Sequence, residues 1–135
     1  MIKILIVDDN KIVRSSIKTL LVLNPKFNVV GECNDGETVI PYLKENDNVD
    51  IILMDISMPK LNGIEATKLV SKHFPAIKVI AFTMHKQDSY IKNMKKAGAM
   101  SYVLKTDDID VINNTIIATF HSDVFIENID QKEDL

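Results

Sequence analysis

The 135-residue sequence predicts an α/β fold in which helices cover both faces of a doubly wound, five-stranded parallel sheet. Five short apolar runs rich in Ile and Val alternate with five amphipathic stretches of helical period. The most continuous runs lack the polar alternation of a half-exposed strand, which indicates burial on both faces, as in a parallel sheet. The length suits a single domain with a full hydrophobic core.

The predicted strands are the apolar runs at 2–7, 27–33, 50–54, 77–82 and 101–104. The first helix is expected to end near Asn24-Pro25, the second to open at 34–36, and the third and fourth to end before Pro75 and at Gly98. Val13, Ile17, Leu20 and Leu21 are expected to share one face of the first helix, and Val39, Ile40 and Leu43 to face inward from the second. Ile64, Thr67, Val70 and Phe74 mark the third helix, and the short fourth helix carries Tyr90, Ile91 and Met94. The fifth helix is expected from about 107 to 120, with Thr106 as its N-cap.

Composition and charge argue against several classes of protein. A formal net charge of −3 makes the chain by itself a poor candidate for binding nucleic acid. A single cysteine, Cys33, rules out a disulfide framework and a CxxC metal site, and its apolar surroundings favour a buried, reduced thiol. No segment approaches the ~18 apolar residues of a membrane span. The beginning of the chain is unlike a secretory signal, so a cytoplasmic location is expected.

Charged and hydroxyl side chains follow four of the predicted strands, at the point where each strand ends. Asp8 and Asp9 follow the first strand, and Asp55 follows the third. Thr83 follows the fourth strand, and the fifth runs into Lys105. Because ligands bind outside the carboxyl ends of parallel strands, we expect these five residues to form one site. If the first and third strands are neighbours, the three Asp residues lie within about one or two strand spacings of ~4.8 Å.

Charge and ligand chemistry at this edge predict a Mg²⁺ site beside a phosphoacceptor. Three Asp residues and one Lys leave a charge of −2, which a hard divalent cation balances, and Asp oxygens suit Mg²⁺. The absence of His and Cys ligands argues against zinc. A carboxylate beside Mg²⁺ can attack phosphorus, while Lys105 and Thr83 can hold the transferring oxygens. The added negative charge can draw Thr83 inward, which makes that residue a candidate switch element.

Each of these residues also has an ordinary structural explanation. The Asp8–Asp9 pair can cap the first helix, and Asp55 can open a turn before Pro59. Thr83 can be a β-branched residue at a strand end, and Lys105 can be a solvated charge. Chemistry explains all of them together, since they converge on one edge of the sheet, so the joint functional site is the preferred interpretation.

Four segments resemble the receiver (CheY-like) domain of bacterial two-component response regulators. They are ILIVDDN (4–10), DIILMDISMPKLNGIEA (50–66), VIAFTMH (79–85) and AGAMSYVLK (97–105). The resemblance covers roughly residues 2–120 and implies the flavodoxin-like strand order 2-1-3-4-5. The segments VVGECNDGETVI and MPKLNGIEATK are most similar to regulators of the NarL/LuxR type. We therefore expect a receiver domain at 1–120, followed at 121–135 by a tail or the start of a linker.

The resemblance implies a metal-binding role for four residues. Asp55 corresponds to the phosphoacceptor, and Asp9 corresponds to a direct Mg²⁺ ligand. Asp8 corresponds to the acidic partner that acts through water. The backbone carbonyl of Ser57 corresponds to the group that completes the metal shell.

The resemblance also implies switch and lifetime residues. Thr83 and Lys105 correspond to the switch hydroxyl and the phosphate-binding lysine. Tyr102 corresponds to the aromatic residue that moves inward on activation; the alternative is an ordinary half-buried strand residue. Met84 is larger than the residue usual at its position and is expected to narrow access to the phosphoacceptor. Ser57 and His85 stand at variable positions that tune the lifetime of the aspartyl phosphate, and His85 can instead be a solvated loop residue.

The partner implied by the resemblance is a sensor histidine kinase, and the output face is the fourth helix, fifth strand and fifth helix (α4-β5-α5 in the family). Lys92, Lys95 and Lys96 form either a solvated helix face or a contact on that output face. A homodimer is possible through this face or through the first and fifth helices (α1-α5), and no membrane partner is expected.

Regulators of the NarL/LuxR type usually carry a C-terminal helix-turn-helix domain, through which alone DNA would be bound. The 135 residues hold no second helical domain. A receiver cut from a longer transcription regulator is therefore the preferred interpretation, and a stand-alone receiver acting by protein–protein contact is the alternative.

Three classes that share the topology or the chemistry fit less well. An FMN binder needs a Ser/Thr/Gly-rich loop after the first strand, where this chain has DDNKIV, which repels phosphate. A phosphohydrolase with an Asp nucleophile is expected to carry a D-x-D pattern there. The four glycines form no GxxxxGK motif of a nucleotide hydrolase. The chain is therefore expected to be a phosphoacceptor signalling domain rather than an enzyme, with the self-catalysed phosphotransfer and autodephosphorylation typical of the family.

Overall fold

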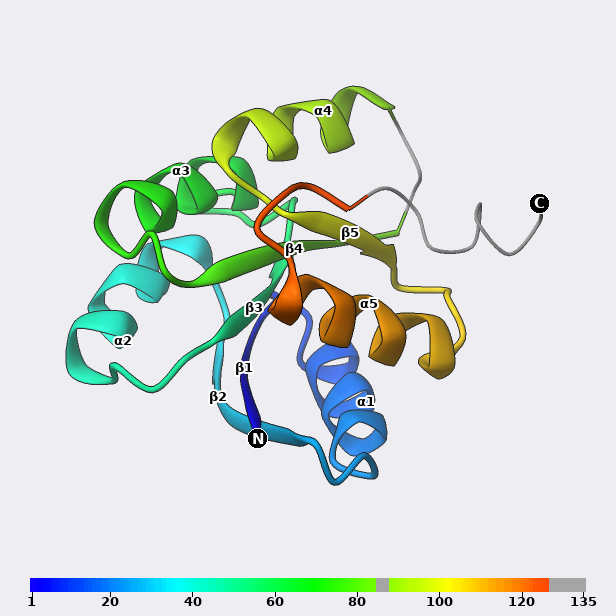
Figure 1. Cartoon of the computed structure of the whole chain (residues 1–135). Helices are drawn as coiled ribbons and strands as arrows, with labels where there is room; N and C mark the ends of the chain where they lie inside the picture. Colours follow the sequence, from blue (N-terminus) through cyan, green and yellow to red (C-terminus); the bar gives the residue numbers. More distant parts are fainter. Residues whose placement is uncertain (85–87, 127–135) are drawn as a thin grey trace.

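The computed structural model describes residues 1–84 and 88–126, in which a five-stranded parallel sheet runs in the order β2-β1-β3-β4-β5 (Figure 1). The strands are β1 (Ile2–Val7), β2 (Phe27–Cys33), β3 (Ile51–Asp55), β4 (Lys78–Thr83) and β5 (Ser101–Leu104). The helices are α1 (Lys11–Leu21), α2 (Val39–Glu45), α3 (Gly63–His73), α4 (Asp88–Ala97) and α5 (Ile109–His121), with a 3-10 turn η1 (Gly36–Thr38) before α2. The predicted fold class and strand order are confirmed.

The helices divide between the two faces of the sheet, as right-handed crossovers require. One face is covered by α1 and α5, and the other by α2, α3 and α4 (Figure 1). The first core contains Ile17 and Leu21 of α1 with Ile112 and Ile116 of α5; the second contains Val39, Leu43, Ala66, Val70 and Met94. Both cores pack on alternate residues of the same strands, so β1 and β3 are almost entirely buried. This explains their continuous apolar sequences.

Cys33 lies at the end of the edge strand β2 and is buried with a free thiol. Burial raises the pKa of this thiol above its ordinary value. The predicted burial of this cysteine is therefore confirmed.

Two local predictions were wrong, one about a helix face and one about a helix boundary. Leu20 is exposed, because it lies about 100° around α1 from the buried Leu21, and it lines a groove next to Ile109 of α5. Thr106 is not a helix N-cap, since α5 begins at Ile109 with Asp108 in the cap position. The residues before it form a turn instead.

The turn between β5 and α5 has a simple cause. The Asp107 carboxylate accepts the N–H of Leu104 at 2.8 Å, and the Asp107 N–H donates to the Leu104 carbonyl at 3.0 Å. These bonds enclose Thr106, so the helix begins later than the sequence suggests.

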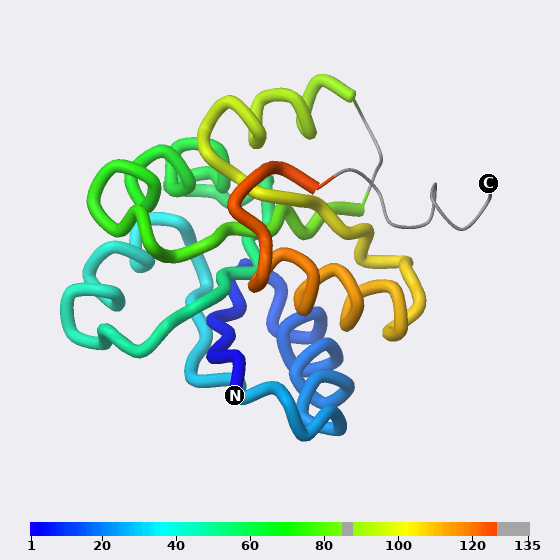
Figure 2. The backbone as a smooth tube through the Cα atoms, in the orientation of Figure 1, coloured from blue at the N-terminus to red at the C-terminus, as the bar shows by residue number. Residues whose placement is uncertain are grey.

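After α5 the chain leaves that helix and runs past the start of β4 and β5 toward α4, as the tube in Figure 2 shows. Lys78 donates to the carbonyls of Phe120 and Ser122 and so ties the end of α5 to β4. The Ile126 N–H donates to the carbonyl of Met100, just before β5, at 2.8 Å. The ring of Phe125 lies under the Lys95 ammonium of α4, 4.6 Å from ring centroid to Nζ. The remainder of the predicted tail, 127–135, lies outside the described residues.

Gly63, the first residue of α3, lies against the backbone at the end of β3. Its N–H donates to the Ile56 carbonyl at 2.7 Å, and a Cβ atom built on it would lie 1.9 Å from the Asp55 carbonyl oxygen. Substituting Ala at Gly63 is expected to lower the free energy of unfolding by about 1–3 kcal/mol, because backbone must move to make room. Urea denaturation followed by circular dichroism measures this loss.

A Gly31→Ala variant is the matched control for that substitution. At Gly31 the new Cβ would meet the end of the Tyr42 side chain rather than backbone. We expect a smaller loss at Gly31, and equal losses would contradict the argument.

Candidate functional site

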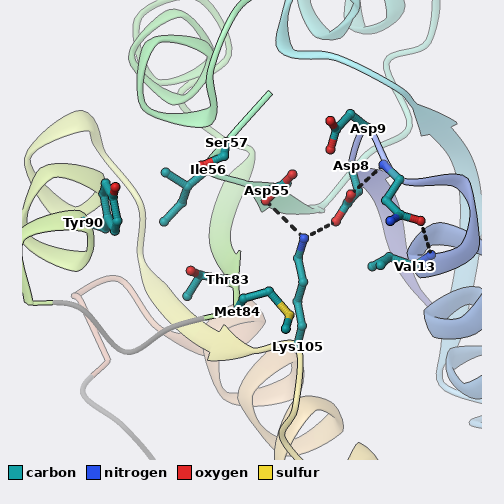
Figure 3. A pocket seen from close by; sticks show the side chains of 11 residues that line it. Asp8, Asp9, Val13, Asp55, Ile56, Ser57, Thr83, Met84, Tyr90 and Lys105 are labelled. Atoms are coloured by element: carbon teal, nitrogen blue, oxygen red, sulfur yellow. Dashed lines mark hydrogen bonds and ion pairs between the residues drawn. The ribbon is translucent and has the colours of Figure 1, made fainter. Parts of the chain in front are cut away.

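Three carboxylates and one ammonium group converge at the carboxyl edge of the sheet (Figure 3). The strands β1 and β3 are direct neighbours, with Val7 opposite Met54, so the residues that follow them come together. One carboxylate oxygen from each of Asp8, Asp9 and Asp55 lies within 4.8 Å of the others. The sequence predicted that the three Asp residues lie close together if the first and third strands are neighbours, and the two strands are neighbours.

The loop after β1 is held by its own hydrogen bonds. Asn10, not the Asp pair, caps α1, because its side-chain oxygen accepts two N–H groups of the first helical turn. Asp8 Oδ1 accepts the Asn10 N–H at 2.9 Å, which leaves Asp8 Oδ2 directed at the sheet edge. Arg14 donates to the Asp8 backbone carbonyl and pairs with Glu32 at 3.1 Å. Asp8 is thereby fixed and buried, whereas Asp9 remains exposed at the rim.

Lys105 lies between two of the carboxylates (Figure 3). Its Nζ is 2.6 Å from Asp8 Oδ2 and 3.2 Å from Asp55 Oδ1, and the three side chains are 11%, 0% and 8% exposed. Burial disfavours the ammonium, but the hydrogen bond with Asp8 and the charge of Asp55 outweigh this and raise the pKa of Lys105. Lys105 is therefore a buried ion-pair partner and not a solvated charge.

The surroundings of Asp55 disfavour its ionised form. Burial first, and then the negative charge of Asp8, raise its pKa to about 6, although Lys105 acts in the opposite direction. The cluster holds three carboxylates against one ammonium, an excess of two negative charges. Hard oxygen donors with that excess, grouped within 4.8 Å, fit a divalent cation such as Mg²⁺. The residues present are therefore suited to the metal that the sequence predicts.

The other predicted residues are distributed around this centre. Ser57, Thr83 and Met84 line the same pocket, whose volume is about 580 Å³. Thr83 is buried, and its backbone carbonyl accepts the Lys105 N–H at 2.7 Å, which joins the ends of β4 and β5. Tyr102 is buried in the core with Met94 of α4 and is not among the described residues that line the pocket. His85 lies outside the described residues.

Two residues near the site were missed or misplaced by sequence reasoning. Tyr90 was considered only as part of the fourth helix, yet it is exposed and lines the pocket that also holds Asp55 and Ser57 (Figure 3). Its position in the sequence shortly after Thr83, at the start of the predicted fourth helix, was the available signal. Asp35 was considered only as part of a helix opening, yet it is a buried carboxylate. A short polar side chain before glycine, between a strand and a helix, was the only sign of it.

The fold and the site define a class: doubly wound α/β domains with an acidic pocket and a buried lysine at the carboxyl edge of the sheet. The sequence model of the response regulator receiver domain matches residues 4–117. This chain therefore belongs to the response regulator receiver domain family, as the sequence predicts.

The chain is similar to regulators of the NarL/LuxR type, as the sequence predicts. The chain is 41% identical over 111 residues to the transcriptional regulatory protein DegU of Brevibacillus brevis, covering 82% of this chain and 47% of that protein. It is 38% identical over 122 residues to the transcriptional regulatory protein LnrK of Bacillus subtilis, covering 90% and 54%. It is also similar to the crystal structure of a LuxR-family response regulator from Aurantimonas sp. SI85-9A1, with a TM-score of 0.80, 28% identity and coverage of 97% and 92%.

The chain spans about half the length of these two curated relatives. Among the described residues, no helix combines the length and the apolar character needed to cross a membrane.

Proposed function

We propose that this domain is a phosphorylation-controlled switch in which Asp55 accepts a phosphoryl group from a phosphohistidine of a sensor histidine kinase. The observation that carries this proposal is the buried Lys105 ammonium, which contacts both Asp8 and Asp55 at the edge of an acidic pocket. A carboxylate oxygen of Asp55 forms the new P–O bond as the P–N bond of the donor breaks. The electron pair of that bond leaves on the imidazole, which takes up a proton.

Mg²⁺ would be held by Asp9, Asp55 and the backbone carbonyl of Ser57, with Asp8 acting through water. When bound, the ion neutralises the carboxylates and the oxygens of the incoming phosphoryl group. Asp9 is exposed and Ser57 lines the pocket, so both can reach a cation that enters from solvent. Lys105 then exchanges its contact with the Asp55 carboxylate for a contact with a phosphoryl oxygen.

Phosphorylation is proposed to act on the rest of the domain through Thr83 and Tyr102. The Thr83 hydroxyl binds a phosphoryl oxygen, and its movement is transmitted to the end of β5 through the bond between its carbonyl and the Lys105 N–H. Tyr102 shares a core with Met94 of α4, so a shift of β5 alters the α4-β5-α5 face. That contact between the two elements supports this surface as the output face.

The output is proposed to be transcription, through a DNA-binding domain outside these 135 residues. The relatives named as transcriptional regulatory proteins, which are about twice as long, support this proposal. In that arrangement residues 1–120 form the receiver, residues 121–135 begin the linker, and the domain works in the cytoplasm. Pairing of two copies through α4-β5-α5 or α1-α5 would join two output domains.

Incubation with phosphoramidate and Mg²⁺, followed by intact mass spectrometry, tests the proposal. We expect the wild type to gain one phosphoryl group, and removal of Mg²⁺ with a chelator to suppress the reaction. The Asp55→Asn variant should gain none. Asp50→Asn, which alters a carboxylate at the opposite edge of the sheet, is the matched control and should react as the wild type does. A phosphoryl adduct on Asp55→Asn would show that the acceptor is another residue.

A further inference from the structure

Asp35 is a buried carboxylate outside the acidic pocket, and its hydrogen bonds reach the loop that carries Ser57. The residue is 5% exposed. Its Oδ1 accepts the N–H groups of Glu37 at 3.1 Å and Leu61 at 2.9 Å, and its Oδ2 accepts that of Lys60 at 3.0 Å. The bond to Glu37 is the ordinary cap of η1. The other two bonds join Asp35 to residues 26 and 25 positions further along the chain, and neither of them caps a helix.

The loop at 56–62 contains no helix or strand, so its position depends on such contacts. The Leu61 peptide is held on both sides, because its N–H donates to Asp35 and its carbonyl accepts the Gly36 N–H at 3.1 Å. A Cβ atom on Gly36 would lie 2.2 Å from the Leu61 carbonyl oxygen, so the backbones at Gly36 and Leu61 lie too close together for a side chain to fit between them. At the other end the Gly63 N–H closes the loop onto the Ile56 carbonyl.

The hydrogen bonds that the Asp35 carboxylate accepts are charge-assisted and therefore stronger than those of a neutral acceptor. Burial alone would raise the pKa of this carboxyl group, but the three backbone N–H donors and the charge of Lys60 outweigh burial and lower it. The group therefore accepts as a carboxylate, and charge-assisted hydrogen bonds are roughly twice as strong as neutral ones.

We infer that Asp35 is a positioning residue for the metal site: it fixes the 56–62 loop so that the Ser57 carbonyl is already aligned toward Asp9 and Asp55. This inference rests on the proposed function, in which that carbonyl is a Mg²⁺ ligand. A ligand on an irregular loop loses conformational freedom when it binds metal, and prior anchoring of the loop reduces that loss. Groups that hold ligands in this way commonly change metal affinity without touching the metal.

Two substitutions separate anchoring of the loop from capping of the turn. Asp35→Asn keeps the shape and one acceptor oxygen, but the amide group that replaces the other oxygen cannot accept the Lys60 N–H. Asp35→Ser keeps a good cap for η1, since Ser is a favoured N-cap residue, and is too short to hold the loop as well. Asp50→Asn is the matched control, because Asp50 Oδ2 likewise accepts a distant backbone N–H, that of Lys3 at 2.9 Å.

Calorimetric titration with Mg²⁺ and thermal unfolding are measured on all four proteins. We expect both Asp35 variants to bind Mg²⁺ about tenfold more weakly than the wild type, which is the low end of the range for supporting groups. Phosphorylation by phosphoramidate should slow at limiting Mg²⁺ and recover at saturating Mg²⁺. Asp50→Asn should lose thermal stability and retain the affinity of the wild type.

If both Asp35 variants unfold at lower temperature but bind Mg²⁺ as tightly as the wild type, Asp35 serves the fold alone and the inference is wrong. If Asp35→Asn does not fold, Asp35→Ser decides the same comparison, because its cap is retained. A wild type that neither binds Mg²⁺ nor accepts phosphate overturns the proposed function instead, so the two failures are distinct.

Discussion

Replacement of Asp55 by Asn is expected to stabilise the metal-free protein at pH 7, by about 1–3 kcal/mol in the free energy of unfolding. Burial and the neighbouring Asp8 raise the pKa of Asp55 to about 6, so the ionised side chain destabilises the folded state at neutral pH. Asn has nearly the same shape without the charge. Lys105 retains its contact with Asp8 at 2.6 Å, so no buried ammonium is left unpaired.

The effect should depend on pH in a defined direction. The folded protein holds the Asp55 proton more tightly than the unfolded chain, whose carboxyl titrates near 3.8. Between about pH 4 and pH 6 the wild type is therefore expected to lose stability as the pH rises, relative to the Asn variant. Below that window both forms carry a neutral group, and the difference should disappear.

Urea denaturation at a series of pH values, with a chelator present, measures this difference. Asp50→Asn is again the control, and it should be destabilised because the bond to the Lys3 N–H is weakened. A wild type that is more stable than Asp55→Asn at pH 7 without metal would refute the electrostatic account of the site.

Replacement of Lys105 by Met is expected to have the largest effect in the opposite direction, a loss of about 3–5 kcal/mol without metal at pH 7. The ammonium lies within 2.6 Å of Asp8 and 3.2 Å of Asp55, and both carboxylates are buried. Without it, two like charges face each other with no compensating cation. Met preserves most of the apolar stem, so the loss reports the missing charge.

Three comparisons isolate the charge effect in this variant. Added Mg²⁺ should restore part of the lost stability, because a cation returns to the site. Adding Asp55→Asn to Lys105→Met should also recover part of it, and a double-mutant cycle measures the coupling. Lys60→Met is the matched control: the Lys60 side chain is 70% exposed and its ammonium pairs with Glu37 at the surface, so the expected change is within about 0.5 kcal/mol. Equal effects at both lysines would contradict the prediction.

Sequence reasoning was accurate wherever strand topology alone decides the outcome. Asp8, Asp9, Asp55, Thr83 and Lys105 each directly follow or end a buried strand, and parallel strands bring those positions to a single edge. Apolar periodicity was sufficient to find these strands, because β1 and β3 are buried on both faces. The predicted chemistry of this edge rests on residue types that tolerate burial only when charges are balanced.

The errors arose where side-chain direction or local hydrogen bonding decides. Leu20 was placed on one helical face with Ile17 and Leu21, but the rotation of α1 against the sheet leaves it exposed. Thr106 has the chemistry of an N-cap, yet the bonds between Leu104 and Asp107 delay the helix. Neither rotation nor turn closure is encoded in a pattern of apolar and polar letters.

By itself, the sequence determined the family, the sheet and the five residues that meet at its carboxyl edge, because these depend on periodicity and on the order of elements along the chain. Only the tertiary structure revealed that Lys105 joins Asp8 to Asp55 and that Asp35 anchors the loop bearing Ser57. Those contacts join segments that are 25 or more positions apart. Their geometry depends on how the loops pack once the sheet has formed.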